Sequence, residues 1–308
     1  MRLAFLGTTS FAVRVLRELA GSAGHRPALV VTPPDRARGR GRRIAPPPVA
    51  TAALELGLDV HQTESVNLET SRRAIAAAGV EIAVVCAFGQ LIREPLLSEL
   101  EMLNVHPSLL PRWRGAAPIE RAIMAGDART GVSIAVVTAG LDSGPLVVRE
   151  QVAIEPHDDY GSLSDRLASR AGPVALRALD ARAAGTFELV EQDDAAATYA
   201  AKLEPAERRL DPGRRADELE RIVRALHPHI GAYLELADGA RLGIRGARAV
   251  DGDLEAGALA AAGGRLLLGC AAGVLEIDRV LPAAGRPMAS ADYLRGHSVP
   301  RLAAEPSR

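Results

Sequence analysis

Cysteine is scarce in this sequence, and so are long apolar runs. The 308 residues include only two cysteines, Cys86 and Cys270, which lie far apart among small and apolar neighbours. A disulfide framework or a cysteine metal site is therefore not expected, and we predict two buried free thiols. No apolar run has the length of a membrane span, and the run after Met1 is too short for a signal peptide. These absences predict a soluble protein of the reducing cytoplasm.

An excess of charge of one sign is also missing. The 37 basic and 38 acidic residues nearly cancel, which argues against a protein that coats nucleic acid in general. Every basic residue except Lys202 is an arginine, so we give weight only to clusters of arginine. The densest cluster lies in residues 33–44, where prolines on both sides exclude a packed helix or a central strand. We therefore predict a long surface loop that contacts phosphate, with a merely solvated loop as the alternative. Its arginines are Arg36, Arg38, Arg40, Arg42 and Arg43.

The length of the chain predicts two domains, and its 48% of hydrophobic residues is enough for a core in each. Residues 1–187 alternate between apolar strand patterns and helical patterns, which is typical of an α/β domain with a mostly parallel, Rossmann-like sheet. The expected strands cover residues 2–6, 28–31, 82–87, 102–105 and 132–137. The first turn lacks a dinucleotide fingerprint, because no second or third glycine follows Gly7 at the required spacing, and we exclude a nicotinamide or flavin oxidoreductase.

The second half of the chain has a different pattern. Residues 188–206 are polar and indicate a linker, and residues 207–308 form the second predicted domain. Here Leu219, Ile222, Val223 and Leu226 mark an amphipathic helix. Short strands are expected near residues 232–236, 242–244, 266–268 and 274–277, with turn signals between them. Short strands at close spacing predict a small β-barrel.

One short stretch carries chemistry. Asn104 and His106 lie two residues apart at the end of an apolar run, so an extended backbone would point both side chains the same way. An amide donor would then lie beside a group that exchanges protons near neutral pH. A third group, Asp142, lies in the glycine-flanked loop of residues 140–144, which could bring a carboxylate toward the imidazole. Taken alone, Asn-x-His is more often a strand end with a surface histidine.

Residues 108–119, with the sequence SLLPRWRGAAPI, decide between these interpretations. Through this segment and along nearly the whole chain, the sequence resembles the folate-dependent formyltransferases, and among them those that act on a charged initiator tRNA. The resemblance implies a Rossmann-like formyltransferase domain followed by an OB-like barrel that binds tRNA. It implies 10-formyltetrahydrofolate as formyl donor and the free amino group of methionyl initiator tRNA as acceptor. It implies no metal, and no protein partner.

The resemblance also assigns roles to residues. Asn104, His106 and Asp142 match the family's catalytic asparagine, histidine and aspartate. Formyl transfer passes through a tetrahedral oxyanion, so the three would respectively donate to the oxyanion, remove the amine proton and hold the imidazole. Arg40 falls at the position of the best-matched basic residue in the family's tRNA-contacting loop. The folate-lining positions fall on Phe88, Gly89, Gln90, Leu91, Ile92, Ser108, Leu109, Leu110, Pro111, Gly140 and Leu141. A buried strand-to-helix turn is the structural alternative for residues 87–92.

Two other interpretations remain. Pro107 after His106 is typical of glycinamide ribonucleotide transformylase, although residues 112–119 and the long C-terminal part are not. An inactive RNA-binding relative would have lost the catalytic groups, and all three are present. His227 and His229 could share a strand face, but no third ligand has a suitable spacing, so we expect a structural turn rather than a metal site.

Overall fold

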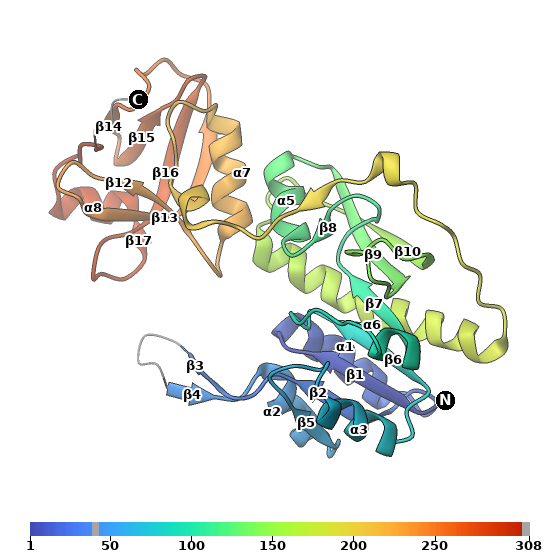
Figure 1. The fold of residues 1–308 in the computed structure, drawn as a ribbon. Helices are drawn as coiled ribbons and strands as arrows, with labels where there is room; N and C mark the ends of the chain where they lie inside the picture. Colours follow the sequence, from blue (N-terminus) through green and yellow to red (C-terminus); the bar gives the residue numbers. More distant parts are fainter. Residues whose placement is uncertain (39–42, 304–308) are drawn as a thin grey trace. The chain divides into compact units, whose positions relative to one another are not determined.

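The computed structural model describes residues 1–38 and 43–303, which form two compact units (Figure 1). The first unit comprises Met1–Pro118, Arg129–Ala153 and Ser164–Ala200, and the second comprises Ile119–Ala128, Ile154–Leu163 and the chain from Ala201 on. The first unit thus includes residues 188–200, for which the sequence predicts a linker. None of the helices described has both the length and the apolar character needed to cross a bilayer.

A seven-stranded sheet forms the centre of the first unit. Its strand order is β10-β9-β7-β6-β1-β2-β5. The five strands from β7 to β5 run parallel, whereas β9 is antiparallel to β7, and β10 to β9. The predicted mostly parallel sheet is therefore confirmed. The strands are β1 (Leu3–Gly7), β2 (Pro27–Thr32), β5 (Val60–Gln62), β6 (Ile82–Cys86), β7 (Glu101–His106), β9 (Arg129–Val136) and β10 (Leu146–Ala153).

Helices cover this sheet on both faces because successive residues of each central strand point to opposite sides and both sets are apolar. Leu6 belongs to a core that includes Ile75 of α3 and Leu96 of α4. On the other face, Gly7 leaves room for Phe5 and for Ala12 of α1. The helices of this unit are α1 (Ser10–Gly21), α2 (Pro48–Glu55), α3 (Glu69–Ala77), α4 (Leu96–Glu99) and most of α6 (Tyr160–Ala184).

The basic segment differs from its prediction. Instead of a loop throughout, β3 (Arg36–Arg38) and β4 (Arg43–Ala45) pair as an antiparallel hairpin of their own, which projects from the end of β2 in Figure 1. The exclusion of a central strand holds, because the hairpin joins no other strand among those described. The side chain of Arg43 is exposed, and Arg36 pairs with Glu64 at 2.8 Å. Arg40 and Arg42 lie outside the described residues.

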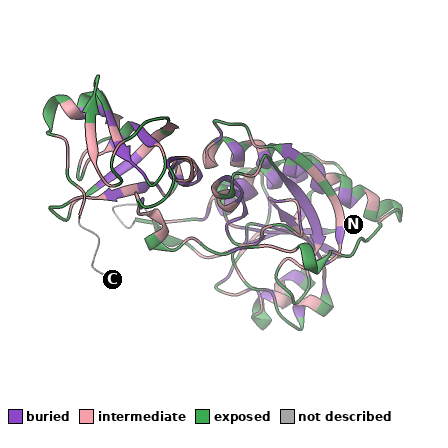
Figure 2. Cartoon of the chain, turned by 90° about the horizontal axis from the view of Figure 1, so that it is seen from above, coloured by how far each residue is buried: buried purple, intermediate pink, exposed green. Residues whose placement is uncertain are grey.

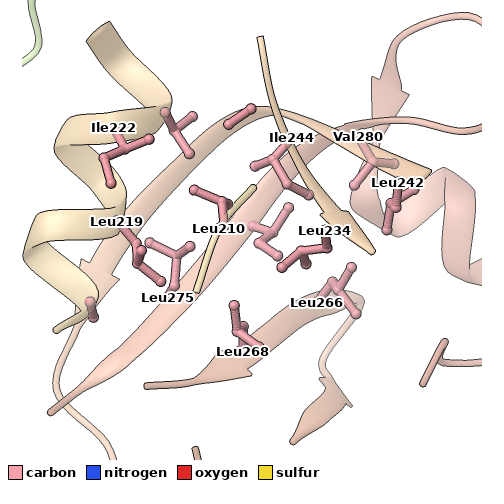
Figure 3. Packing of buried hydrophobic residues seen from close by; sticks show 14 of the residues in the cluster. Leu210, Leu219, Ile222, Leu234, Leu242, Ile244, Leu266, Leu268, Leu275 and Val280 are labelled. Carbon is pink, nitrogen blue, oxygen red and sulfur yellow. The ribbon is translucent and has the colours of Figure 1, made fainter. Parts of the chain in front are cut away.

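An antiparallel sheet and the helix α7 (Ala216–Leu226) build the second unit. The strand order is β12-β13-β16-β15-β14, with β17 paired to β16, and the predicted OB-like fold class is confirmed. The apolar face of α7 packs Leu219 and Ile222 onto a core that includes Leu234, Ile244 and Leu275 (Figure 3). Its strands are β12 (Ala232–Glu235), β13 (Arg241–Val250), β14 (Leu259–Ala262), β15 (Arg265–Gly269), β16 (Val274–Leu281) and β17 (Met288–Ala289). Its other helices are α5 (Pro118–Ala125) and α8 (Ser290–Gly296).

Buried residues lie both in the strands and in the helices of each unit (Figure 2). Cys86 ends β6 and Cys270 follows β15, and both are buried free thiols, as predicted. Burial raises the pKa of each thiol. Neither cysteine is therefore a candidate nucleophile.

Candidate active site

Asn104 and His106 lie on the last residues of β7. Their main chain is extended and pairs with β9, where Asn104 lies opposite Ala135 and His106 opposite Ser133. The two side chains therefore point to the same face of the sheet, as the spacing predicts. His106 is buried and Asn104 is half-buried.

Asp142 meets both of these side chains. Asn104 Nδ2 donates a hydrogen bond of 2.9 Å to Asp142 Oδ1, and the backbone N–H of Gly115 donates one of 2.8 Å to Oδ2. His106 Nδ1 lies 3.6 Å from Oδ2. The structure thus brings the amide, the imidazole and the carboxylate together, with the carboxylate between the other two.

The second ring nitrogen fixes the tautomer of His106. Nε2 lies 2.8 Å from the carbonyl oxygen of Trp113. A carbonyl only accepts, so Nε2 carries a hydrogen, and in the neutral ring Nδ1 is the free base. A proton taken up at Nδ1 would face the Asp142 carboxylate, which stabilises the imidazolium. This arrangement suits proton removal from a substrate amine.

Hydrogen bonds of two serine hydroxyls hold the segment after β7 in place. Ser108 Oγ donates to the carbonyl oxygen of Arg112 at 2.6 Å, and Ser133 Oγ donates to that of Ser108 at 2.7 Å while it accepts from the N–H of Leu110. Ser108 and Leu110 are fully buried, whereas Leu109 and Pro111 are half-buried. The hydroxyl of Ser108 thus stabilises a turn.

The other predicted folate-lining residues follow β6 or precede Asp142. Phe88 and Ile92 are buried, Gly89 has a φ of +76°, and the side chain of Gln90 accepts from the N–H of Val66 at 2.7 Å. Leu91 and Leu141 are instead 60% and 59% exposed. Gly140 packs against the hydroxyl of Ser143. The loops after β6 and β7 leave the sheet at the edge where parallel α/β sheets bind ligands, and Leu91 and Leu141 offer apolar surface without a partner in the protein core.

Sequence reasoning missed two polar residues beside Asp142. Arg114 is 3% exposed and hydrogen-bonds to Gln192. Gln192 in turn donates to the main chain of the Asp142 loop. No local pattern marks Gln192, which lies in a polar segment. Arg112 is exposed and lies over the ring of Trp113, 4.5 Å from its centroid.

Of the two histidines His227 and His229, the second contacts a carboxylate and an aromatic ring. His229 lies 3.0 Å from Glu120 and stacks on Tyr160 with ring centroids 3.6 Å apart. No three His, Cys, Asp or Glu side chains gather as a metal site in the described part of the chain.

Comparisons with known proteins identify the family of this chain. A family model described as "Formyl transferase" matches residues 1–179, and "Formyl transferase, C-terminal domain" matches residues 202–298. The methionyl-tRNA formyltransferase of Halorhodospira halophila is 45% identical over 300 residues, covering 96% of each chain. That of Parvibaculum lavamentivorans is 41% identical over 304 residues, covering 97% of this chain and 98% of the relative. HypX from Aquifex aeolicus, solved in complex with tetrahydrofolic acid, shares the fold with a TM-score of 0.65 at 18% identity, over all of this chain and 50% of HypX. The chain therefore belongs to the formyl transferase family, and within it to the methionyl-tRNA formyltransferases.

Proposed function

We propose that this protein transfers the formyl group of 10-formyltetrahydrofolate to the free amino group of methionyl initiator tRNA, in the cytoplasm. The product is N-formylmethionyl-tRNA for translation initiation. The contact of Asp142 with both Asn104 and His106 carries this proposal. Relatives of 41–45% identity over nearly their full length are named for the same activity.

The three side chains divide the work of the reaction. The amine nitrogen attacks the formyl carbon, and its proton passes to Nδ1 of His106. Asn104 gives one amide hydrogen to Asp142 and has a second, which suits the oxyanion that develops on the formyl oxygen. The carbon–nitrogen bond to the folate then breaks, and the folate nitrogen takes up the proton that His106 had received. Asp142 faces the imidazolium until that proton is passed on.

For the formyl donor, we propose the loops of residues 88–92, 108–111 and 140–141 as its lining. A folate needs hydrogen bonds from main-chain groups at its pterin edge and apolar surface along its rings. Leu91 and Leu141 offer the apolar surface. Gly89 leaves the main chain accessible because it lacks a side chain.

For the tRNA, we propose the β3–β4 hairpin and arginines of the second unit. From Ala206 on, 15 basic and 14 acidic residues leave a net charge of only about +1. Some arginines of this region pair with a carboxylate and others do not. Among the described residues, no carboxylate lies within ion-pair distance of Arg208 or Arg245. Burial, and then the charge of Arg208, lowers the pKa of Arg245. A half-buried guanidinium beside a like charge is well suited to a phosphate.

Transfer of labelled formyl from 10-formyltetrahydrofolate tests the activity. We expect formylation of methionyl initiator tRNA and no useful rate with glycinamide ribonucleotide, since a small nucleotide has no use for the second unit. Comparable transfer to both acceptors would favour the nucleotide enzyme's activity. Absence of transfer to either, with tRNA binding retained, would indicate an inactive relative.

Neutralising the basic hairpin should weaken tRNA binding. For Arg40→Leu and Arg43→Ala we expect lower tRNA affinity and a log–log salt dependence shallower by about 0.9 for each duplex phosphate that no longer meets an arginine. Folate binding should stay unchanged. Arg73→Ala is a matched control, because Arg73 is exposed on α3 and pairs with Glu69 of the same helix. If affinity and slope match wild type in both variants, the basic segment is only a solvated element.

A further inference from the structure

Gln192 lies in the chain between the two family-matched regions, at a main-chain turn of the active site. Its Nε2 donates to two carbonyl oxygens, of Asp142 at 2.9 Å and of Gly144 at 2.7 Å. Its Oε1 accepts from Nε and Nη2 of Arg114 at 3.1 and 2.9 Å. Because a guanidinium only donates and a carbonyl only accepts, the amide has one possible orientation, and every hydrogen-bonding atom of it is used.

Arg114 is itself held rigidly. Its Nη2 also donates to Asp194 Oδ1 at 2.8 Å, so the buried guanidinium has a counter-charge from the segment that carries Gln192. Its main chain belongs to β8 (Arg114–Gly115), which pairs in parallel with β11 (Tyr199–Ala200). The next residue, Gly115, gives its N–H to the Asp142 carboxylate. Arg114 and its neighbour therefore contact the Asp142 loop by two routes, one through the carboxylate and one through Gln192.

The Asp142 loop needs such support. Asp142 has a φ of +48°, a left-handed conformation that persists in a non-glycine residue when its surroundings over-determine it. Gly144 passes so close to Val136 that a Cβ at Gly144 would lie 1.9 Å from the Val136 carbonyl oxygen. The two carbonyl groups that Gln192 binds flank this turn. Removing their donor would free the main chain that aims the carboxylate at His106.

We propose that Gln192, oriented by Arg114, is a positioning residue for formyl transfer, which fixes the turn of residues 142–144 so that the Asp142 carboxylate faces His106. This inference rests on the proposed function. Gln192 touches neither His106 nor Asn104 in any described contact and acts through the main chain of Asp142.

The isosteric change Gln192→Glu separates positioning from mere anchoring. Glutamate keeps the size and pairs with Arg114, so a residue that only anchors its segment would tolerate the change. A carboxylate cannot donate to the two carbonyl groups, so the turn would lose its support. We expect kcat to fall roughly 10- to 100-fold, by analogy with two lost hydrogen bonds, with little change in KM for either substrate. The pH profile of kcat should also change, because the position of the Asp142 carboxylate relative to the His106 ring changes.

A control variant and a direct measurement of the turn complete the test. Glu191→Gln, at the exposed neighbour of Gln192, is the matched control and should behave as wild type in kcat and melting temperature. Hydrogen exchange at the Gly115 amide reports the bond to Asp142 directly and should be faster in Gln192→Glu, even if wild type forms no formylated product. Faster exchange in Gln192→Glu together with no formylated product from wild type would reject the proposed function but keep the role of Gln192 in fixing the turn. Wild-type exchange, kcat and pH profile in Gln192→Glu would overturn the inference.

Discussion

His106→Ala is expected to lower the single-turnover rate of formyl transfer by about 10²- to 10⁴-fold, the range for loss of a general base. The free Nδ1 of His106 faces the Asp142 carboxylate at 3.6 Å, and no other described contact of this carboxylate involves a group that takes up protons near neutral pH. The affinity for tRNA should be nearly unchanged, because the side chain is buried on β7 and belongs to a different sheet from the basic hairpin.

The control is His157→Ala, because His157 is exposed and lies on a different segment. Asp142→Ala should also lower the rate by orders of magnitude, and the double variant with His106→Ala should be little worse than the single variants. Groups that act as a unit lose most of their benefit when one is removed. A near-wild-type single-turnover rate in His106→Ala would remove the histidine from the mechanism.

Asn104→Ala is expected to lower kcat by about 10²- to 10³-fold, which is the usual effect of one lost oxyanion donor and equals roughly 3 to 4 kcal/mol. The effect has two sources, because the same amide also donates to Asp142 Oδ1 at 2.9 Å. Asn104→Asp keeps the shape but donates nothing and sets a carboxylate beside Asp142, so it should be at least as damaging.

The KM for each substrate separates the two roles of the amide from simple substrate binding. An oxyanion donor acts in the transition state, so kcat and kcat/KM should fall together. A change confined to KM would indicate a contact with the ground state only. Retention of kcat within a few-fold in both variants would contradict the assignment of Asn104.

Much of the sheet follows from the sequence because buried parallel strands are apolar on both faces. The strand that carries Asn104 and His106 was expected over residues 102–105 and extends from Glu101 to His106. β10 was not expected: it lies at the edge of the sheet and carries Arg149, Glu150 and Gln151, which hide its alternation. Helix α6 was also missed, since it contains Gly172 and Pro173 and is rich in alanine, so its apolar stripe has little contrast.

The candidate site was predictable in part for a similar reason. Parallel strands end at one edge, which places Asn104 and His106 of β7 where such sheets bind ligands. Asp142 follows β9, which is antiparallel to β7, so this rule does not account for its place beside them. The contacts of Gln192 are of another kind, because one polar side chain meets the main chain of residues 142 and 144, some 50 positions earlier. No local sequence pattern in a polar stretch predicts such a contact. The hairpin strands β3 and β4 were hidden by the prolines and arginines around them. The domain boundaries at residues 187 and 207 stay a prediction.

The pairing of β11 with β8 determines where a fragment for expression should end. A fragment that stops at residue 187 would contain Asn104, His106 and Asp142 but would lack both β11 and the amide of Gln192. Its buried Arg114 would also lose the counter-charge of Asp194. A self-sufficient catalytic fragment therefore has to continue to Ala200, the last residue of β11. By the same reasoning, a loop graft or chain break is better placed among residues 201–204 than among residues 188–200.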